Sequence, residues 1–374
     1  MRVALDVSSA PRQLGGAGRY IRELAVRLPD CALATTLVTR RADGDRWREW
    51  SPAADVDALV PNARVARLMY EAWALGASRA ARAVDVWHAP HYTMPHRAST
   101  PVVVTIHDLT YFTAPQWHER TKATFFRRAI TYAARHADVL ISVSDFTARQ
   151  LDQWLPDHGP VVVAPLGVDL ERFAAVTSGD DDAHLRAHGL DSDVPYVLFL
   201  GTLEPRKGLD VLLDAFAEVA RDDATIELWL AGQRGWGIET LDVLVRSHPA
   251  NQRIRRLGFV DDDVLPALLR RARAVAYPSR AEGFGLPVLE ALACGAIVVT
   301  SEETVMADVA GGAATLVSIG DRPGLARALL ESLHCGDDER YRRALVGRRR
   351  AELFTWDRMM AQHVAAYNLA VGGS

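Results

Sequence analysis

Short apolar runs alternate with longer amphipathic stretches along the chain, and this alternation constrains the fold more than any other feature of the sequence. In the first such pair, the apolar run Val3–Val7 is followed by the stretch Ala17–Leu28, in which Ile21, Leu24 and Leu28 recur at helical spacing. Strands that alternate with helices predict parallel sheets covered by helices on both faces.

The alternation pauses once, over residues 169–195, which contain the acidic run Asp180-Asp181-Asp182 and a short helical piece but no strand pattern. A chain of 374 residues is long enough for two cores. The sequence therefore predicts two doubly wound α/β domains that face each other across a cleft. The predicted strands are Val3–Val7, Leu33–Val38, Val84–Trp87, Val102–Ile106, Val139–Val143, Val161–Ala164, Tyr196–Gly201, Ile226–Leu230, Ile254–Leu257, Ala274–Tyr277 and Ala296–Thr300, and further helices are predicted over Val65–Ala83 and Thr121–Ala137.

Composition and charge exclude several classes of protein. The formal net charge of −4 lacks the basic excess that nucleic-acid binding requires. Cys31, Cys294 and Cys335 lie far apart and form no CxxC pair, which argues against a disulfide framework or a zinc site built on cysteines and favours a reducing compartment. No apolar run approaches the length of a membrane span, and the residues from Met1 to Val7 predict a first strand rather than a secretion signal. We expect a cytoplasmic protein.

The stretch AEGFGLPVLEAL at residues 281–292 predicts an anion site. Gly283 and Gly285 permit backbone conformations that are closed to other residues. The free N–H groups at the start of the following helix attract a phosphate group. Glu282 and Glu290 would then each accept hydrogen bonds from a different sugar, one on each side of a diphosphate. In isolation, the same two glutamates are also explained as a surface residue and a partner of the helix dipole.

A basic pair follows an earlier strand of the same half, where residues 201–208 read GTLEPRKG. Arg206 can grip phosphate oxygens in a fork, and Lys207 supplies a compact positive charge. Alone, the pair is equally well explained as an ordinary solvated one. Ligands of open parallel sheets bind beyond the carboxyl ends of the strands. A glycine-rich anion loop and a basic loop that both follow strands therefore favour a nucleoside diphosphate as the ligand.

The first half of the chain offers weaker candidates. Gly15 and Gly16 open the run GGAG between a strand and a helix, where they would let the backbone approach a ligand or simply form a flexible turn. They do not form the GxGxxG fingerprint, so a dehydrogenase is disfavoured. His107 ends the predicted strand Val102–Ile106, at the edge where ligands bind, and a structural role explains it equally well.

Two acidic runs match the DxD spacing of metal-assisted sugar transfer. Asp191-Ser192-Asp193 precedes a predicted strand rather than following one. Asp261-Asp262-Asp263 follows a strand, but Asp261 suits the N-cap of the next helix. Structural roles are favoured for both runs, and no metal is expected.

Together these motifs resemble those of the family 4 retaining glycosyltransferases. The stretch EGFGLPVLE matches the family's E-x7-E motif, and the resemblance covers most of the chain. The segments that carry it are GTLEPRKG and AYPSRAEGFGLPVLEALACGAIVVTS, with VALDV…LGGAGRYIREL, VVTIHDL, ISVSDFTARQL, VVVAPLGVD and LFTWDRMMAQHVAAY. The resemblance implies a GT-B fold of two Rossmann-like domains: an acceptor-side domain over 1–170, a nucleotide-sugar-binding domain over 171–353, and a closing helix over 354–374 that crosses back to the first domain.

The resemblance also implies roles for individual residues. Glu282 would contact the hydroxyls of the donor sugar, Glu290 would hold the ribose, and Arg206 and Lys207 would face the diphosphate. Thr202 departs from the pattern, because many members carry arginine at this position, so either Arg206 or another arginine, Arg280, must supply the missing charge. The implied catalytic residues are His107, Arg206, Lys207 and Glu282, and the implied donor-binding residues are Gly15, Gly16, Phe259, Val260, Gly283, Phe284, Gly285, Leu286 and Glu290.

The activity that the resemblance implies is transfer of a hexose from a nucleoside-diphosphate sugar to a hydroxyl of a glycan or glycolipid acceptor, with retention and without metal or cofactor. GDP-mannose is the preferred donor, because GTLEPRKG and GGAGRY resemble bacterial mannosyltransferases. A transferase that uses UDP-glucose or UDP-GlcNAc and a sugar-nucleotide epimerase of the same fold are the alternatives. A glycoside hydrolase would leave the basic pair without a role, and a non-catalytic binding protein would hold the donor without turning it over.

Contact with a membrane surface is a further alternative for one predicted helix. The helix over Thr121–Ala137 carries Lys122, Arg127 and Arg128 beside Phe125, a pattern that suits either an anionic lipid surface or an ordinary surface helix. Peripheral contact at the inner face of a membrane is therefore the alternative to a purely cytoplasmic location.

Overall fold

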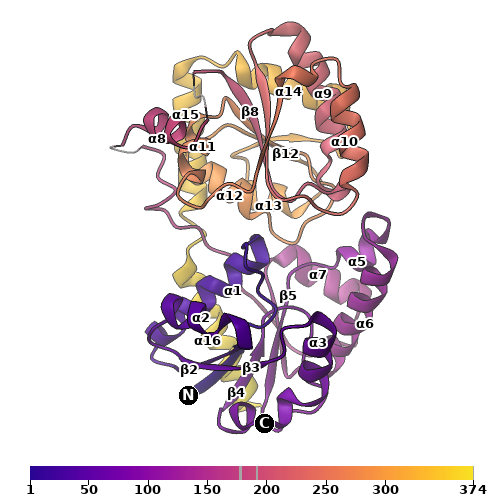
Figure 1. Cartoon of the computed structure of the whole chain (residues 1–374), viewed down its shortest axis with the longest axis vertical. Coiled ribbons are helices and arrows are strands. Elements are labelled where there is room, and N and C mark those ends of the chain that lie inside the picture. Colours follow the sequence, from indigo (N-terminus) through magenta and orange to yellow (C-terminus); the bar gives the residue numbers. More distant parts are fainter. Residues whose placement is uncertain (177–178, 191–192, 374) are drawn as a thin grey trace. The chain divides into compact units, whose positions relative to one another are not determined.

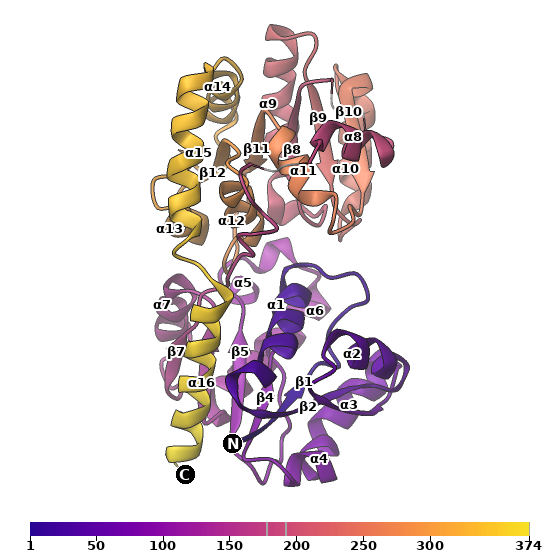
Figure 2. The same cartoon turned by 90° about the vertical axis from the view of Figure 1, so that its left-hand side faces the viewer.

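The computed structural model describes residues 1–176, 179–190 and 193–373. The chain separates into two compact units. The first comprises Met1–Pro115, Glu119–Gly167 and the residues from Trp356 on, and the second comprises Gln116–His118 and Val168–Thr355. Each unit is built on one parallel sheet with helices on both of its faces, which confirms the predicted α/β class (Figures 1 and 2).

The sheet of the first unit has seven strands in the order β3-β2-β1-β4-β5-β6-β7. All neighbouring strands run parallel, so β1 pairs with β2 on one side and β4 on the other. The central strands are buried on both faces, as their continuous apolar sequences predict. The strands are β1 Arg2–Asp6, β2 Ala34–Arg40, β3 Asp55–Val60, β4 Val86–Ala89, β5 Val102–Ile106, β6 Val139–Ser142 and β7 Val161–Val163.

The sheet of the second unit has six strands in the order β10-β9-β8-β11-β12-β13, again all parallel. Strands β8 and β11 lie side by side although many residues separate them in the sequence. The loops that follow these two strands therefore leave the same edge of the sheet next to each other. The strands are β8 Tyr196–Leu200, β9 Glu227–Ala231, β10 Ile254–Gly258, β11 Ala274–Tyr277, β12 Val298–Ser301 and β13 Thr315–Val317.

The helices cover the two sheets in the way the alternating sequence predicts. In the first unit they are α1 Gly16–Arg27, α2 Gly44–Trp50, α3 Arg64–Trp73, α4 Arg79–Arg82, α5 Thr110–Thr113, α6 Arg120–His136, α7 Asp145–Trp154 and α16 Trp356–Gly372. In the second unit they are α8 Asp181–Ala187, α9 Leu209–Asp222, α10 Ile238–Ser247, α11 Leu265–Arg271, α12 Leu286–Ala293, α13 Val305–Ala310, α14 Arg322–Leu333 and α15 Asp337–Ala351.

The sequence prediction was wrong for one helix and missed two strands. The helix predicted over Val65–Ala83 is broken, because α3 ends at Trp73. A side chain at Gly76 would place its Cβ 1.8 Å from the carbonyl oxygen of Arg97, so close packing of backbones interrupts the helix there. The missed strands, β3 and β13, are edge strands whose residues are mostly only half-buried.

The described residues include no helix that is both long and apolar enough to cross a membrane. The basic helix α6 buries Phe126 and Ile130 in the first unit, while Phe125 is 37% exposed. The greater part of its apolar side therefore packs inward.

Candidate functional site

Two loops of the second unit meet at the carboxyl edge of its sheet, one after β8 and one after β11. Gly208 has φ of 70°, and a Cβ at this position would lie 2.1 Å from the carbonyl oxygen of Pro278. In addition, the amide of Arg280 donates to the carbonyl of Arg206 over 2.9 Å. The two loops thus touch backbone to backbone, which requires glycine at position 208.

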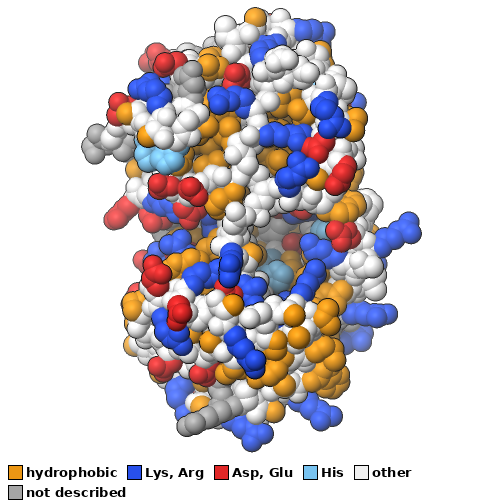
Figure 3. Space-filling view, in the orientation of Figure 1, with side chains coloured by type: hydrophobic (Ala, Val, Ile, Leu, Met, Phe, Trp, Pro, Cys, Tyr) orange, Lys and Arg blue, Asp and Glu red, His pale blue; other side chains and the backbone are white. Residues whose placement is uncertain are grey.

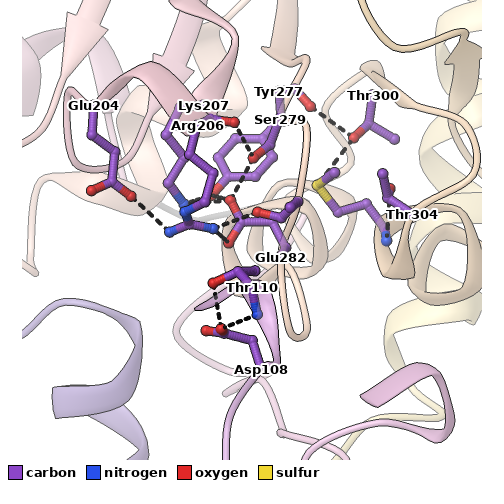
Figure 4. Close-up of polar contacts among 12 residues, drawn as sticks. Asp108, Thr110, Glu204, Arg206, Lys207, Tyr277, Ser279, Glu282, Thr300 and Thr304 are labelled. Atoms are coloured by element: carbon purple, nitrogen blue, oxygen red, sulfur yellow. Dashed lines mark hydrogen bonds and ion pairs between the residues drawn. The ribbon is translucent and has the colours of Figure 1, made fainter. Parts of the chain in front are cut away.

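The carboxylate of Glu282 is the centre of a polar cluster formed by these loops (Figure 4). Lys207 Nζ donates to Glu282 Oε1 over 2.5 Å, and Arg206 donates to Oε2 over 2.8 Å. The hydroxyl of Ser279 donates to Oε1 over 2.6 Å, and that of Tyr277 does so over 3.3 Å. The structure thus brings together three of the four residues that the sequence analysis assigns to catalysis.

Each cation of the cluster has a second partner. Lys207 Nζ donates to the hydroxyl of Tyr277 over 2.7 Å, and Arg206 donates to Glu204 over 2.7 Å and to the carbonyl of Ala281. The side chain of Lys207 is 9% exposed and that of Arg206 13% exposed. Both cations are therefore held in fixed positions with only their edges open to a ligand.

Opposite charges lie next to each other in this cluster. Burial alone would raise the pKa of Glu282, but the adjacent Arg206 and Lys207 outweigh it and hold that pKa at about 2. Burial lowers the pKa of Lys207, and Glu282 opposes the effect. Two cations thus face two carboxylates, those of Glu204 and Glu282, in a water-poor site. A ligand that draws Glu282 away would free the ammonium of Lys207 and one edge of Arg206, whose other edge Glu204 still contacts.

Helix α12 begins beside this cluster. Gly285 is its N-cap with φ of 97°, and a Cβ there would lie 2.8 Å from Met306 Cγ, so the turn requires glycine. The side chains of Phe284 and Leu286 are buried, and Phe284 packs edge-on against Phe354. The backbone of this turn is therefore better suited to a ligand than these side chains are, and Leu286 offers the first N–H of α12, a group without an intrahelical partner.

Two further groups of predicted donor-binding residues lie elsewhere in the second unit. Glu290 lies one turn into α12 and is buried. Phe259 and Val260 follow β10, and Phe259 is 38% exposed, so its ring is accessible for stacking.

The remaining candidates, Gly15, Gly16 and His107, belong to the first unit. Gly15 is the N-cap of α1 and Gly16 is its first residue. His107 follows β5, and its Nε2 lies 2.8 Å from the carbonyl oxygen of Pro90. A carbonyl only accepts, so Nε2 carries the proton and Nδ1 keeps a lone pair. Burial lowers the pKa of His107, so the ring is neutral near pH 7.

Sequence reasoning missed Glu204, Tyr277 and Ser279, which fix the two cations and Glu282 in place. Their position next to β8 and β11 was the available signal, because Tyr277 ends β11 and Ser279 follows it closely. Of the two arginines considered for the charge missing at Thr202, Arg280 donates to both oxygens of Asp210 over 2.8 and 2.6 Å and stacks on Trp117.

A cavity of about 170 Å³ lies against the loop after β8. Leu203 and Pro205 from this loop line it together with Trp117, Leu241 and Leu244. Its wall is mostly apolar; it includes Glu204, the partner of Arg206, but neither Lys207 nor Glu282.

Comparisons with known proteins cover both halves of the chain. A family model described as Glycosyltransferase Family 4 matches residues 14–172, and one described as Glycosyl transferases group 1 matches residues 180–346. The O-antigen chain mannosyltransferase B of Escherichia coli is 30% identical over 287 residues, which span 76% of this chain and 74% of that protein.

Solved structures with the same architecture span the whole chain. Sucrose-phosphate synthase from Thermosynechococcus elongatus matches with a TM-score of 0.79 and 23% identity over 100% of both chains. Anabaena Alr3699/HepE, solved in complex with UDP and glucose, matches with a TM-score of 0.75 and 21% identity over 98% of both chains. These likenesses confirm the GT-B fold.

Proposed function

The chain belongs to the family 4 glycosyltransferases. From this premise we propose that it transfers mannose from GDP-mannose to a hydroxyl of a glycan or glycolipid acceptor. The configuration at the anomeric carbon is retained, and no metal assists the transfer. The observation that carries this proposal is the cluster of Arg206, Lys207 and Glu282 beside the start of α12.

The cluster suits a diphosphate leaving group. In the reaction the bond between the anomeric carbon and the β-phosphate oxygen breaks, and a bond from the anomeric carbon to the acceptor oxygen forms. Negative charge develops on the diphosphate, which takes up the proton of the acceptor hydroxyl. Lys207, Arg206 and the amides at the start of α12 stabilise this charge, which is the main catalytic contribution expected of preorganised donors. Glu282, released from the cations, accepts hydrogen bonds from hydroxyls of the donor sugar.

Arg206, rather than Arg280, supplies the charge that the family places at position 202. Arg280 is committed to Asp210 and to the carbonyl of Pro205, so it serves to hold the loop after β8 in shape. Arg206 already points toward Glu282 and needs only a change of partner.

Two of the comparisons bear on the sugar and the base of the proposed donor. The E. coli relative is a mannosyltransferase, which supports mannose. The Anabaena structure contains UDP and glucose, so UDP-glucose is the main alternative. Within the second unit, Phe259, Val260 and Glu290 complete the proposed donor site, and Gly15, Gly16 and His107 stay predicted donor-binding or catalytic residues of the first unit.

A donor screen tests the activity. Purified protein is incubated with GDP-mannose, UDP-glucose or UDP-GlcNAc and an acceptor mixture, with and without EDTA, and release of the nucleoside diphosphate is measured. Release from GDP-mannose that EDTA does not reduce supports the proposal. Activity that EDTA abolishes and manganese restores would overturn metal independence, and conversion of the sugar nucleotide without any acceptor would indicate an epimerase.

A second experiment tests donor binding without turnover. The chain contains two lysines, the exposed Lys122 and the buried Lys207, so protein labelled with ¹³C at the lysine ε-carbon gives two NMR signals. GDP or GDP-mannose should shift the Lys207 signal and leave that of Lys122 in place. A saturating donor that shifts neither signal would remove Lys207 from the diphosphate site.

A further inference from the structure

Two histidines and an aspartate meet on the surface of the second unit, apart from the polar cluster described above. His184 lies on α8, and His188, one turn further along, is the C-cap of this helix. Asp263 lies between β10 and α11. One ligand atom from each of the three residues lies within 4.8 Å of the other two. In Figure 3, histidine side chains gather beside acidic ones on the surface where Figure 1 labels α8.

The surrounding contacts hold this group in place. Helix α8 packs on α11, and Arg270 of α11 donates to both oxygens of Asp181 over 2.8 and 2.7 Å. The Nε atom of the neighbouring Arg271 lies 2.6 Å from Oδ1 of Asp182. These ion pairs join the first turn of α8 to the helix that follows Asp263, so the spacing of the three side chains does not depend on their own contacts.

Hydrogen bonding prepares His188 as a ligand. Its Nδ1 lies 2.9 Å from the carbonyl oxygen of His184. Because the carbonyl only accepts, Nδ1 carries the proton and Nε2 keeps its lone pair. A hydrogen bond from one ring nitrogen to a carbonyl is the arrangement that orients histidine ligands in metal sites. His188 and Asp263 are exposed and His184 is half-buried, so an ion can reach all three.

We propose that His184, His188 and Asp263 bind a divalent transition metal, with Zn²⁺ as the first choice. Two imidazole nitrogens and one carboxylate oxygen suit Zn²⁺, Co²⁺ or Ni²⁺, whereas Mg²⁺ and Ca²⁺ prefer oxygen ligands throughout. Water fills the remaining coordination positions. The ion joins the end of α8 to the segment before α11 and stabilises the second unit.

This site is separate from the proposed transfer reaction and does not rest on it. None of its ligands belongs to the cluster around Glu282, so removal of the metal should lower the temperature of unfolding and leave the transfer rate of the folded enzyme unchanged.

The test uses the full chain, freed of metal with EDTA and then dialysed. ZnCl₂ is titrated by calorimetry, and thermal unfolding is followed with and without zinc. The wild type should bind one Zn²⁺ at this site and unfold at a higher temperature when zinc is present, because an ion that binds the folded state stabilises it. His184→Gln and Asp263→Asn should each weaken this binding at least about tenfold and abolish the thermal shift. Asp261→Asn, an exposed aspartate two residues from Asp263, is the matched control and should behave as the wild type.

Cobalt separates this site from binding at the cysteines. Co²⁺ at two imidazoles and a carboxylate gives no thiolate-to-metal charge-transfer band, whereas Co²⁺ at Cys31 or Cys335 would give one. Equal zinc affinity in the wild type and both ligand variants, or a thiolate band with the full cobalt stoichiometry, would overturn the proposal.

Discussion

Lys207 is the residue whose position is hardest to explain by stability alone. Its ammonium is buried, and burial lowers its pKa, so the folded protein gives up hydration to keep this charge beside Glu282. A buried cation held by a short ion pair and a tyrosine hydroxyl is poised for an anionic ligand.

Replacement of Lys207 by alanine should therefore lower the transfer rate on the order of 10²- to 10³-fold, as loss of a preorganised donor to developing negative charge does. Steady-state release of the nucleoside diphosphate measures the effect. Lys122→Ala removes the other lysine, which is exposed on α6, and should retain the full rate. An undiminished rate in Lys207→Ala would refute its assignment.

At Glu71 of the first unit, burial outweighs the neighbouring positive charge, whereas at Glu282 the neighbouring cations outweigh burial. Burial, followed by repulsion from the buried Asp6, raises the pKa of Glu71 to about 7, although Arg67 and the hydroxyl of Thr93 contact its carboxylate. The folded state thus binds a proton that the unfolded state has released between about pH 4.5 and pH 7, so the free energy of unfolding falls as pH rises through this window.

Substitution Glu71→Gln should remove this fall. We expect its free energy of unfolding relative to the wild type to grow between about pH 5 and pH 7, by up to about 1.4 kcal/mol per pH unit. Urea unfolding at several pH values measures it. Glu49→Gln, on the exposed face of α2, is the control and should follow the wild type. A constant difference between Glu71→Gln and the wild type would contradict the linkage.

At the level of elements, the two loops of the polar cluster depend on one close backbone contact. Gly208→Ala combines a positive φ with a Cβ only 2.1 Å from the carbonyl oxygen of Pro278. Gly189→Ala has nearly the same φ, 72°, but its Cβ meets nothing within 4 Å. The pair separates the cost of the backbone conformation from that of the contact.

Gly189→Ala should cost about 1–2 kcal/mol of stability, and Gly208→Ala clearly more, with loss of transfer activity because Arg206 and Lys207 are displaced. Chemical denaturation and the donor-release assay measure the two effects. Equal stability losses in the two variants would show that the two loops move apart without a loss of stability. This result would contradict the requirement for glycine at position 208.

The elements also show how far the sequence alone carries. Buried central strands such as β1, β5 and β8 are apolar runs and were predicted, whereas the edge strand β3, with the sequence DVDALV, has no apolar run to detect. Because ligands of parallel sheets bind beyond the carboxyl ends of the strands, the sequence predicted that the loops carrying Lys207 and Glu282 lie at the same edge of the sheet. It could not reveal that the two side chains pair with each other, because that depends on the backbone contact between Gly208 and Pro278.

At the level of the whole molecule, the last helix completes the core of the first unit through a chain of hydrogen bonds. His363 Nδ1 lies 2.8 Å from the carbonyl oxygen of Met359 and so carries the proton. Its Nε2 must then accept from the hydroxyl of Tyr20 over 2.7 Å, and the oxygen of Tyr20 accepts from Thr105 over 2.7 Å. Helix α16 is thereby joined to α1 and β5.

The same series of hydrogen bonds continues from Thr105 to Tyr367, and the donor of each bond is fixed by the bond before it. Because Thr105 donates to Tyr20, its oxygen accepts from His88 Nε2 over 2.8 Å, and His88 Nδ1 accepts from the hydroxyl of Tyr367 over 2.8 Å. Each buried group has one role, so both histidines must be neutral for the chain to form.

Protonation should therefore weaken the first unit. Burial lowers the pKa of His363 to about 4 and that of His88 well below its usual value. The contribution of these neutral histidines to stability is fully present above about pH 6.5 and is lost as pH falls toward the folded-state pKa values. Hydrogen exchange resolved by peptide should show α16 and β4 losing protection below about pH 6. Retained protection down to pH 4 would contradict this account.

Tyr367→Phe tests the same chain at neutral pH. The phenylalanine ring fills the same buried space on α16, but His88 Nδ1 is left without a donor. An unsatisfied buried acceptor costs about 1–3 kcal/mol, so urea unfolding should show a loss of stability of that size in the first unit. Tyr132→Phe, whose hydroxyl makes an exposed hydrogen bond to the carbonyl of His96, is the matched control and should change stability by less than about 0.5 kcal/mol. Equal effects of the two variants would mean that His88 finds another donor, and that the chain from α16 to β4 does not fix the last helix in the first unit.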